Sequence, residues 1–320
     1  MTVGGQAVIE GVMMRAPGMI ATAIRRTDGT ITVRREAFIS ITKRLPFLTF
    51  PLLRGALGII EMLIVGIRTL NFSAEIAMED AREGVHEEAA DGKTNPRAGI
   101  MLGVTVAIAF AVGIALFFVT PLVLTSVFFA VDQNPIQFNL LAGGIRLALF
   151  LIYLLGIARM RDVQRLFAYH GAEHKAVFAY ENGGELTLAS ALRQSRFHPR
   201  CGTSFLLVVM ISAIIIFALL DGLLLRWLGE LTLWIRLLTH LPLIPLVGGL
   251  SYELIRVSAR HARSWWGRLL VAPGLWLQTV TTREPDEGQV EVALAALKGA
   301  LDNVEGRVSP SSTPSLAGAA

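Results

Sequence analysis

Long apolar runs follow one another after residue 98, separated by short polar segments. Four of these runs reach the roughly 18 apolar residues that a membrane-spanning helix needs. They lie at about residues 99–130, 138–158, 203–225 and 231–254. Pro121 predicts a kink in the first run, and Pro242 and Pro245 interrupt the fourth. The pattern therefore predicts an all-α polytopic membrane domain over residues 99–285, with about four transmembrane helices.

The preceding segment, residues 47–98, follows a different pattern. Its first part, 47–70, is apolar but carries Arg54, Glu61 and Arg68, which are seven residues apart and so share one helical face. This predicts an amphipathic helix that lies in the plane of the membrane or packs against other helices, followed by an acidic loop. We favour the in-plane helix, because a further span would place the basic N-terminal region outside the cell.

The two ends of the chain look soluble. Within residues 1–46, the segments 19–26 and 31–38 flank an Asp-Gly turn, which predicts a small β hairpin. After the last span, 265–280 is typical of an interfacial helix with tryptophans at headgroup depth. Residues 286–320 are expected to form a polar-faced helix, at 287–301, and a disordered tail.

Composition supports the membrane assignment. Of the 320 residues, 53% are hydrophobic and only 17% are charged, against about 25% charged in soluble proteins. The net charge is +4, but the basic residues cluster beside the spans, so we expect the lipid bilayer and no nucleic acid as a partner. The single cysteine excludes an intramolecular disulfide and fits a reducing compartment.

Charge in the loops predicts the orientation. Arginine and lysine are concentrated in the loop 159–202 and after the fourth span, whereas the connection 131–135 has none. The positive-inside rule then places the loop 159–202, the β hairpin and both termini in the cytoplasm.

The loop 159–202 carries the candidate chemistry. His170, Glu173 and His174 form the H-x-x-E-H pattern of inverted zinc peptidases on a predicted helix at 161–180. Two imidazoles four residues apart share a helical face, and His198 and Cys201 follow within the same loop. Together, these histidines and the cysteine predict a binding site for a divalent metal ion such as zinc.

Two kinds of metal site fit these residues. With His170, His174, His198 and Cys201 all bound, the site would be closed and structural. With His170, His174 and one of the other two bound, an open position would leave Glu173 as a general base. The alternative without a metal is that these residues form hydrogen bonds or contact lipid phosphates.

Other polar residues have predicted roles around this site. Arg200 or Arg15 would hold an anionic group of a substrate. Glu253 ends the fourth span on the predicted cytoplasmic side and is the available candidate for a further carboxylate in catalysis or metal binding.

Several longer blocks resemble the DUF1385 (YqhQ-like) family of bacterial membrane proteins. The resemblance extends over about residues 3–285. The blocks are 4–15, 169–175, 198–204, 251–253, 273–278 and 281–285. It implies a metal-dependent enzyme of the bacterial inner membrane, with the metal at the matching histidines. Because Glu10 and Arg15 belong to the first block, we expect the N-terminal segment to fold onto the site.

The leading hypothesis is therefore a zinc-type hydrolase with a cytoplasm-facing site that acts on a membrane-associated substrate. The second hypothesis is a membrane scaffold or assembly factor with a structural metal. A transporter is a third, because Arg236 and His240 lie four residues apart within the fourth span. Neither the substrate nor the oligomeric state follows from the sequence.

Overall fold

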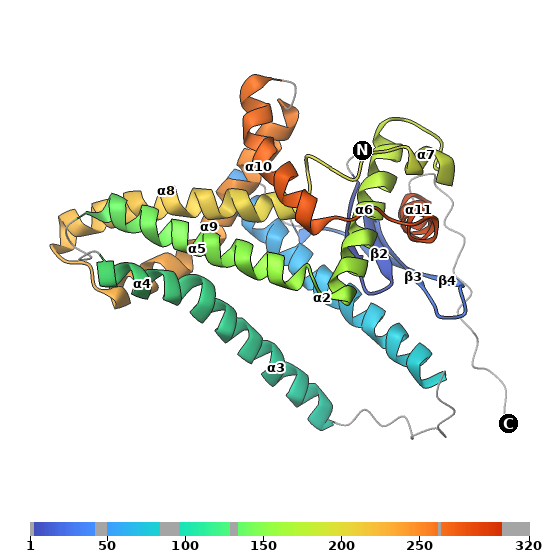
Figure 1. Ribbon diagram of the computed structural model, residues 1–320, viewed down its shortest axis with the longest axis horizontal. Helices are drawn as coiled ribbons and strands as arrows, with labels where there is room; N and C mark the ends of the chain where they lie inside the picture. Colours follow the sequence, from blue (N-terminus) through green and yellow to red (C-terminus); the bar gives the residue numbers. More distant parts are fainter. Residues whose placement is uncertain (1–2, 42–49, 84–95, 129–133, 262–263, 303–320) are drawn as a thin grey trace.

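The computed structural model describes residues 3–41, 50–83, 96–128, 134–261 and 264–302. The described part is mostly helical, with one small sheet near the N-terminus (Figure 1). The acidic loop beyond residue 83 and the C-terminal tail expected from the sequence lie outside the described residues.

The sheet is a four-stranded antiparallel meander in the order β1-β2-β3-β4. Its strands are β1 (Gly4–Val8), β2 (Gly11–Ala16), β3 (Gly18–Arg25) and β4 (Ile31–Phe38). The predicted hairpin is confirmed as β3 and β4, but the sequence did not reveal β1 and β2. All residues from Gly11 to Met14 are buried, so β2 lacks the alternation of apolar and polar positions that marks a half-exposed strand.

Helices α4 (Thr120–Phe128), α5 (Pro135–Ile157), α8 (Gly202–Leu228) and α9 (Leu233–Arg260) form an elongated bundle. Helix α3 (Pro96–Ile114) precedes α4 and extends away from the bundle (Figure 1). A π-helical turn, η2 (Ala115–Val119), joins α3 to α4 and ends two residues before Pro121, near the place where a kink was expected. Helices α5, α8 and α9 run side by side, and α9 continues through both of its prolines (Figure 1).

Within the residues that the structure describes, five helices are long and apolar enough to cross a membrane, which supports a multi-pass membrane protein. The segments are Arg54–Arg82, Ala107–Phe128, Pro135–Ile157, Gly202–Leu228 and Leu233–Ser258. Four of them match the predicted spans. The fifth belongs to α2 (Pro51–Glu83), which extends well beyond the predicted end at residue 70.

Helix α2 contacts both the bundle and the sheet. At its N-terminal end, Gly55 lies so close to Gly249 of α9 that an added Cβ would fall 2.8 Å from the Gly249 backbone. Nearly three turns further along the helix, Val65 packs with Met13 and Ile20 of the sheet. Helix α2 therefore connects the bundle of apolar helices to the β sheet.

Helices α6 (Arg161–Glu181), α10 (Trp265–Thr281) and α11 (Glu287–Leu301) agree with the predicted elements. A short helix, α7 (Leu188–Leu192), follows α6 in the chain. The sheet, α6, α7 and α11 gather at one end of the bundle and form what we call the sheet unit (Figure 1). Its core joins Val12 of β2, Ala176 of α6 and Leu297 of α11, so the chain's two ends and its middle share one core.

Candidate metal centre

Helix α6 presents His170 and His174 on one face, with their ring centroids 4.4 Å apart. A segment that follows α10 runs alongside this helix, where the Arg283 N–H donates to the carbonyl of Phe167. Gly171 permits this approach, because a Cβ there would lie 2.1 Å from the Arg283 carbonyl oxygen. The glycine inside the motif is thus explained by close backbone packing.

Backbone carbonyls hold both imidazoles in the same tautomer. The Nδ1 of His170 lies 2.8 Å from the Thr281 carbonyl oxygen, and the Nδ1 of His174 contacts the carbonyl of Arg196. A carbonyl oxygen only accepts hydrogen bonds, so each Nδ1 carries the proton and each neutral ring keeps the lone pair on Nε2. Metal-binding histidines are commonly oriented in this way.

Cys201 lies where these lone pairs meet. Its Sγ is 3.2 Å from the Nε2 of His170, and it also forms a hydrogen bond with the His174 imidazole. The residue caps the N-terminus of α8, where its sulfur accepts the Thr203 N–H. One thiol proton can serve only one of the two nitrogens, so a cation between the three groups would satisfy them better than hydrogen bonds do.

The three side chains fit a zinc-type ion. Among the described residues, His170, His174 and Cys201 form a group whose ligand atoms all lie within 4.8 Å of one another. Tetrahedral zinc places sulfur and nitrogen ligands about 3.5 Å apart, given the usual bond lengths. Burial lowers the pKa of His174, an effect that its hydrogen bond to Cys201 only partly offsets, and a neutral imidazole is the form that binds metal.

Glu173 lies beside the group but outside it. The side chain is buried, at 7% exposure, and accepts the backbone N–H of Gly5 in β1. Burial raises its pKa, and the nearby charges of His170 and His198 partly oppose that rise. A buried carboxyl with a raised pKa next to a metal site is suited to proton transfer rather than to binding the ion.

The N-terminal turn packs against the same helix. Glu10, which has a positive φ of 53°, pairs with Arg165 of α6 and accepts the Tyr169 hydroxyl proton. Glu10 therefore ties the N-terminal block to α6, and the Gly5 N–H is the group of this block that contacts Glu173. Arg15 instead lies over the ring of Phe38 and contacts the Met62 sulfur, at the junction between the sheet and α2.

A family model described as "Protein of unknown function (DUF1385)" matches residues 50–303. The "Uncharacterized protein YqhQ" of Bacillus subtilis (strain 168) is 34% identical over 311 residues, which is 93% of this chain and 92% of that protein. The chain belongs to the DUF1385 family. No solved structure matches it.

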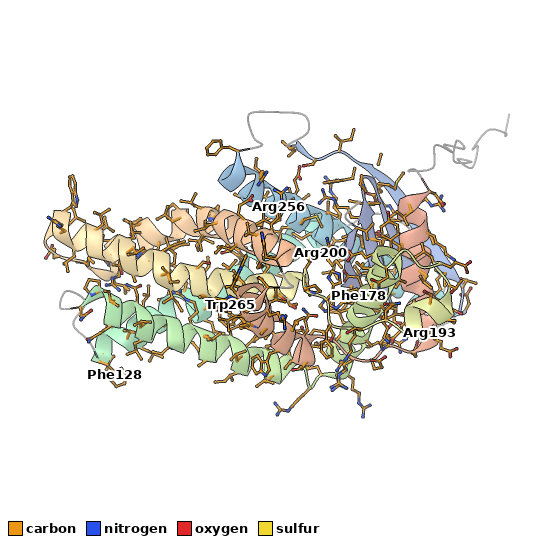
Figure 2. All side chains as sticks on the ribbon, turned by 90° about the horizontal axis from the view of Figure 1, so that it is seen from above. Phe128, Phe178, Arg193, Arg200, Arg256 and Trp265 are labelled. Carbon is orange, nitrogen blue, oxygen red and sulfur yellow. The ribbon has the colours of Figure 1, made fainter. Side chains whose placement is uncertain are left out.

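In this DUF1385 protein, the structure does not bring His198 into the group of three ligands. Its ring lies 5.6 Å from that of His174, and its Nε2 is 3.4 Å from a carboxylate oxygen of Glu181. The same Glu181 pairs with Arg200, whose pKa is lowered by burial. Figure 2 shows Arg200 near the junction of the bundle and the sheet unit, and Phe128 at the opposite tip.

Glu253 is likewise placed apart from the group. It forms an ion pair of 2.7 Å with Arg54, through two hydrogen bonds, and so joins α9 to the start of α2. The structure gives Glu253 a role in holding two helices together.

Sequence reasoning missed the groups that orient the site. The carbonyls of Thr281 and Arg196 and the N–H of Gly5 are backbone atoms, which every residue type provides. No sequence pattern distinguishes them. Gly171 is the residue of the motif whose type reflects the close approach of another segment to α6.

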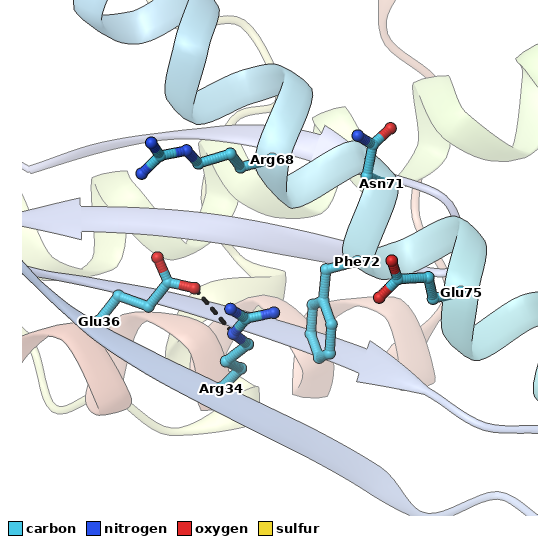
Figure 3. Close-up of a pocket in the computed structure, with 6 residues that line it drawn as sticks. All are labelled: Arg34, Glu36, Arg68, Asn71, Phe72 and Glu75. Atoms are coloured by element: carbon cyan, nitrogen blue, oxygen red, sulfur yellow. Dashed lines mark ion pairs between the residues drawn. The ribbon is translucent and has the colours of Figure 1, made fainter. Parts of the chain in front are cut away.

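A separate hollow of about 330 Å³ lies between β4 and α2 (Figure 3). Arg34 pairs there with Glu36 at 2.7 Å and covers the ring of Phe72. Neither histidine nor cysteine lines it. The hollow therefore lacks the residue types that bind zinc-type ions, and we assign the chemistry to the histidine–cysteine group.

Proposed function

We propose that this DUF1385 protein is a metal-dependent membrane enzyme whose zinc-type ion is held by His170, His174 and Cys201. One observation carries the proposal: two backbone carbonyls fix both Nδ1 protons, so that both Nε2 lone pairs face a single thiol. Three protein ligands with a further position open are typical of catalytic zinc sites, whereas four ligands are typical of structural ones.

The proposed reaction is hydrolysis of a membrane-associated substrate at a cytoplasm-facing site. A bound zinc-type ion would supply Lewis-acid activation of water and of the scissile group. Glu173 would accept the proton from the attacking water and return it to the leaving group, a role for which burial and a raised pKa suit it. His170 is the most exposed of the three ligands, so substrate would approach from its side.

The proposed setting is the bacterial inner membrane, with four spans and both termini in the cytoplasm. In this topology α2 does not cross the bilayer. Its exposed apolar residues form one stripe, while the opposite side packs on the sheet. The stripe consists of Ile60, Leu63, Ile64, Ile67 and Leu70. A helix with these two faces suits the membrane surface, where it would seat the sheet unit.

Metal content tests the central claim. The full-length protein is purified in detergent without added metal or chelator, and bound metal is measured by mass spectrometry for the wild type and for His170→Ala/His174→Ala. We expect about one ion per wild-type chain and a loss of nearly all of it in the variant. Near-zero metal in both proteins would refute the proposal.

A structural metal in a membrane scaffold is the second candidate, and the burial of the site favours it. His174 is 2% exposed and Cys201 is 6% exposed, which leaves little room for a substrate at those two ligands. Cobalt(II) substitution separates the two functions. A hydroxamate ligand should change the cobalt absorption spectrum if a coordination position is open, and should leave it unchanged if the site is closed.

Two variants test the roles assigned to Glu173 and Cys201. Glu173→Gln should keep the metal and the cobalt spectrum, since Glu173 is not a ligand. Cys201→Ser should lose the sulfur-to-cobalt absorption band. If Glu173→Gln abolishes metal binding, the assignment of Glu173 to proton transfer is wrong.

A further inference from the structure

A basic hollow of about 570 Å³ opens where α5 ends and where the chain leaves α10. It is lined by Leu155, Ala158, Arg159, Arg196, Thr279, Val280, Thr282, Arg283 and Glu284. Three arginines face one glutamate, so the lining has a net charge of +2 (3 − 1). This hollow is separate from the one in Figure 3, and the side chains that line it have no role in the proposed hydrolysis.

The single acidic group of the hollow is already engaged. A carboxylate oxygen of Glu284 lies 2.7 Å from the Nζ of Lys175, which is 5% exposed, and its other oxygen is 3.8 Å from Arg196. Within the described ranges, neither Arg159 nor Arg283 forms an ion pair, and both are exposed. The positive charge of these two guanidinium groups is therefore available to a ligand.

The wall on the α5 side is apolar and continues along a predicted span. Leu155 is 46% exposed, and Ile152, three residues earlier on the same face, is 67% exposed. Helix α5 is one of the five helices able to cross a membrane. A ligand with an anionic head in the hollow would thus lay its apolar part along α5, within the hydrocarbon region.

We infer that this hollow binds the phosphate headgroup of an anionic phospholipid. Guanidinium groups match phosphate through paired hydrogen bonds, and basic pockets beside membrane helices are known to hold anionic lipid headgroups. The apolar wall favours a lipid over a free phosphate, because a free phosphate makes no use of it. The inference rests on the hollow alone and does not require a metal.

The hollow shares its backbone with the candidate metal centre. Arg196 lines the hollow, while its carbonyl accepts the His174 Nδ1–H. Thr282 lines it too and directly follows Thr281, whose carbonyl holds His170. An Arg196 Nη1–H donates to the Thr282 carbonyl and so links the segment before α8 to the segment after α10. A bound lipid would therefore stiffen the segments that orient both imidazoles.

Binding of short-chain lipids by the delipidated, full-length protein in neutral detergent tests the inference. Calorimetric titrations use dioctanoyl phosphatidylglycerol, dioctanoyl phosphatidylcholine and inorganic phosphate with the wild type, with Arg159→Gln/Arg283→Gln, and with Arg256→Gln. Arg256 lies on α9 outside the lining, so the last variant controls for loss of charge alone. We expect saturable binding of phosphatidylglycerol and an affinity about 30-fold lower for the double variant, since each arginine near an anionic lipid contributes.

The other outcomes decide against the inference. Equal affinity of the wild type and the double variant, or the same loss in Arg256→Gln, would overturn it, as would equal binding of phosphatidylcholine. Displacement of the lipid by an equal concentration of inorganic phosphate would show a soluble phosphate as the ligand and would overturn the lipid assignment. The altered arginines are exposed, and unchanged thermal unfolding of the double variant confirms that it folds. Metal content is measured in parallel, so the two proposals fail independently.

Discussion

Gly171 shows how a single residue connects the motif to the rest of the protein. The glycine lowers the intrinsic stability of α6 by up to about 1 kcal/mol relative to alanine. In return, the segment of Thr281 to Arg283 lies directly against the helix, and the Thr281 carbonyl reaches His170. The motif therefore includes the space around Gly171 as well as its titratable side chains.

We predict that Gly171→Ala lowers both stability and metal content, although it alters no ligand. The added methyl group would meet the Arg283 carbonyl oxygen at 2.1 Å and push that segment away. The expected loss of stability is about 1–3 kcal/mol, the usual cost of overpacking. Thermal unfolding and metal analysis of the purified protein measure the two effects.

Gly144→Ala in α5 is the matched control for this prediction. An added Cβ there meets nothing within 4 Å, so the variant should unfold at the wild-type temperature or above it. If both variants behave alike, the close approach at Gly171 does not matter.

At the scale of the helical elements, a buried polar network connects the ends of three membrane helices. Asp221 of α8 lies 3.2 Å from Arg236 and 2.9 Å from His240, both of α9, and 2.7 Å from the Asn139 amide of α5. All four side chains are at most 5% exposed. Arg236 and His240, on which the transporter hypothesis rested, therefore pair with Asp221 of a neighbouring helix.

We predict that Asp221→Leu destabilises the protein by about 3–5 kcal/mol, because it leaves the charge of Arg236 buried without its carboxylate. Thermal unfolding in detergent measures the change. Glu230→Gln, at an exposed acid in the connection between α8 and α9, removes the same charge outside the network and should unfold as the wild type does. A similar small effect of both variants would argue against a stabilising role for the network.

Helix α11 also depends on contacts with segments far from it in the chain. The sequence predicts a polar-faced helix in the tail of the chain, yet Val290, Ala293 and Leu297 are fully buried against the sheet and α6. Its start is fixed by a capping box in which Asp286 and Gln289 bond each other's backbone. The helix is therefore part of the core around the candidate site.

We predict that Leu297→Ala lowers the free energy of unfolding by about 2–5 kcal/mol, the range for truncating a buried leucine. The neighbouring Lys298→Ala, at an exposed position, should change it by less than about 0.5 kcal/mol. Denaturant unfolding monitored by circular dichroism compares the two. Equal effects would mean that α11 does not contribute to the folded core.

At the scale of the whole molecule, the two ends of the bundle differ in chemistry. The sheet unit, the candidate metal centre and the basic hollow lie at one end, whereas Phe128 and the turn between α8 and α9 lie at the other (Figures 1 and 2). Trp227 and Trp234, which flank the connection between α8 and α9, are both exposed. This arrangement suits a protein whose chemistry is confined to one membrane surface.

Cysteine labelling tests the proposed orientation. Asp28→Cys in the β3–β4 turn and Glu230→Cys in the α8–α9 connection place reporters at opposite ends of the protein. We expect a membrane-impermeant maleimide to label Glu230→Cys in intact spheroplasts, and Asp28→Cys only after lysis. The wild type, whose single cysteine is buried, measures the background. Labelling of Asp28→Cys before lysis would contradict a cytoplasmic sheet unit.

Local sequence patterns determined the elements that depend on neighbouring residues. Apolar runs of sufficient length located α5, α8 and α9, and the spacing of three and four residues located α6 with His170, Glu173 and His174 on it. These predictions succeeded because helix periodicity and hydrophobic length are properties of one continuous segment. The β3–β4 hairpin succeeded for the same reason, since its turn lies between adjacent strands.

Only the tertiary structure decided which distant groups meet. It placed Cys201 rather than His198 between the imidazoles, paired Glu253 with Arg54, and supplied the carbonyls of Thr281 and Arg196 as the groups that orient the rings. It also added β1, whose residues are mostly half-buried, and β2, whose residues are mostly buried, and neither strand shows an alternation of buried and exposed positions. Such contacts depend on the packing of segments far apart in the chain and on backbone atoms that every residue shares, so no local pattern encodes them.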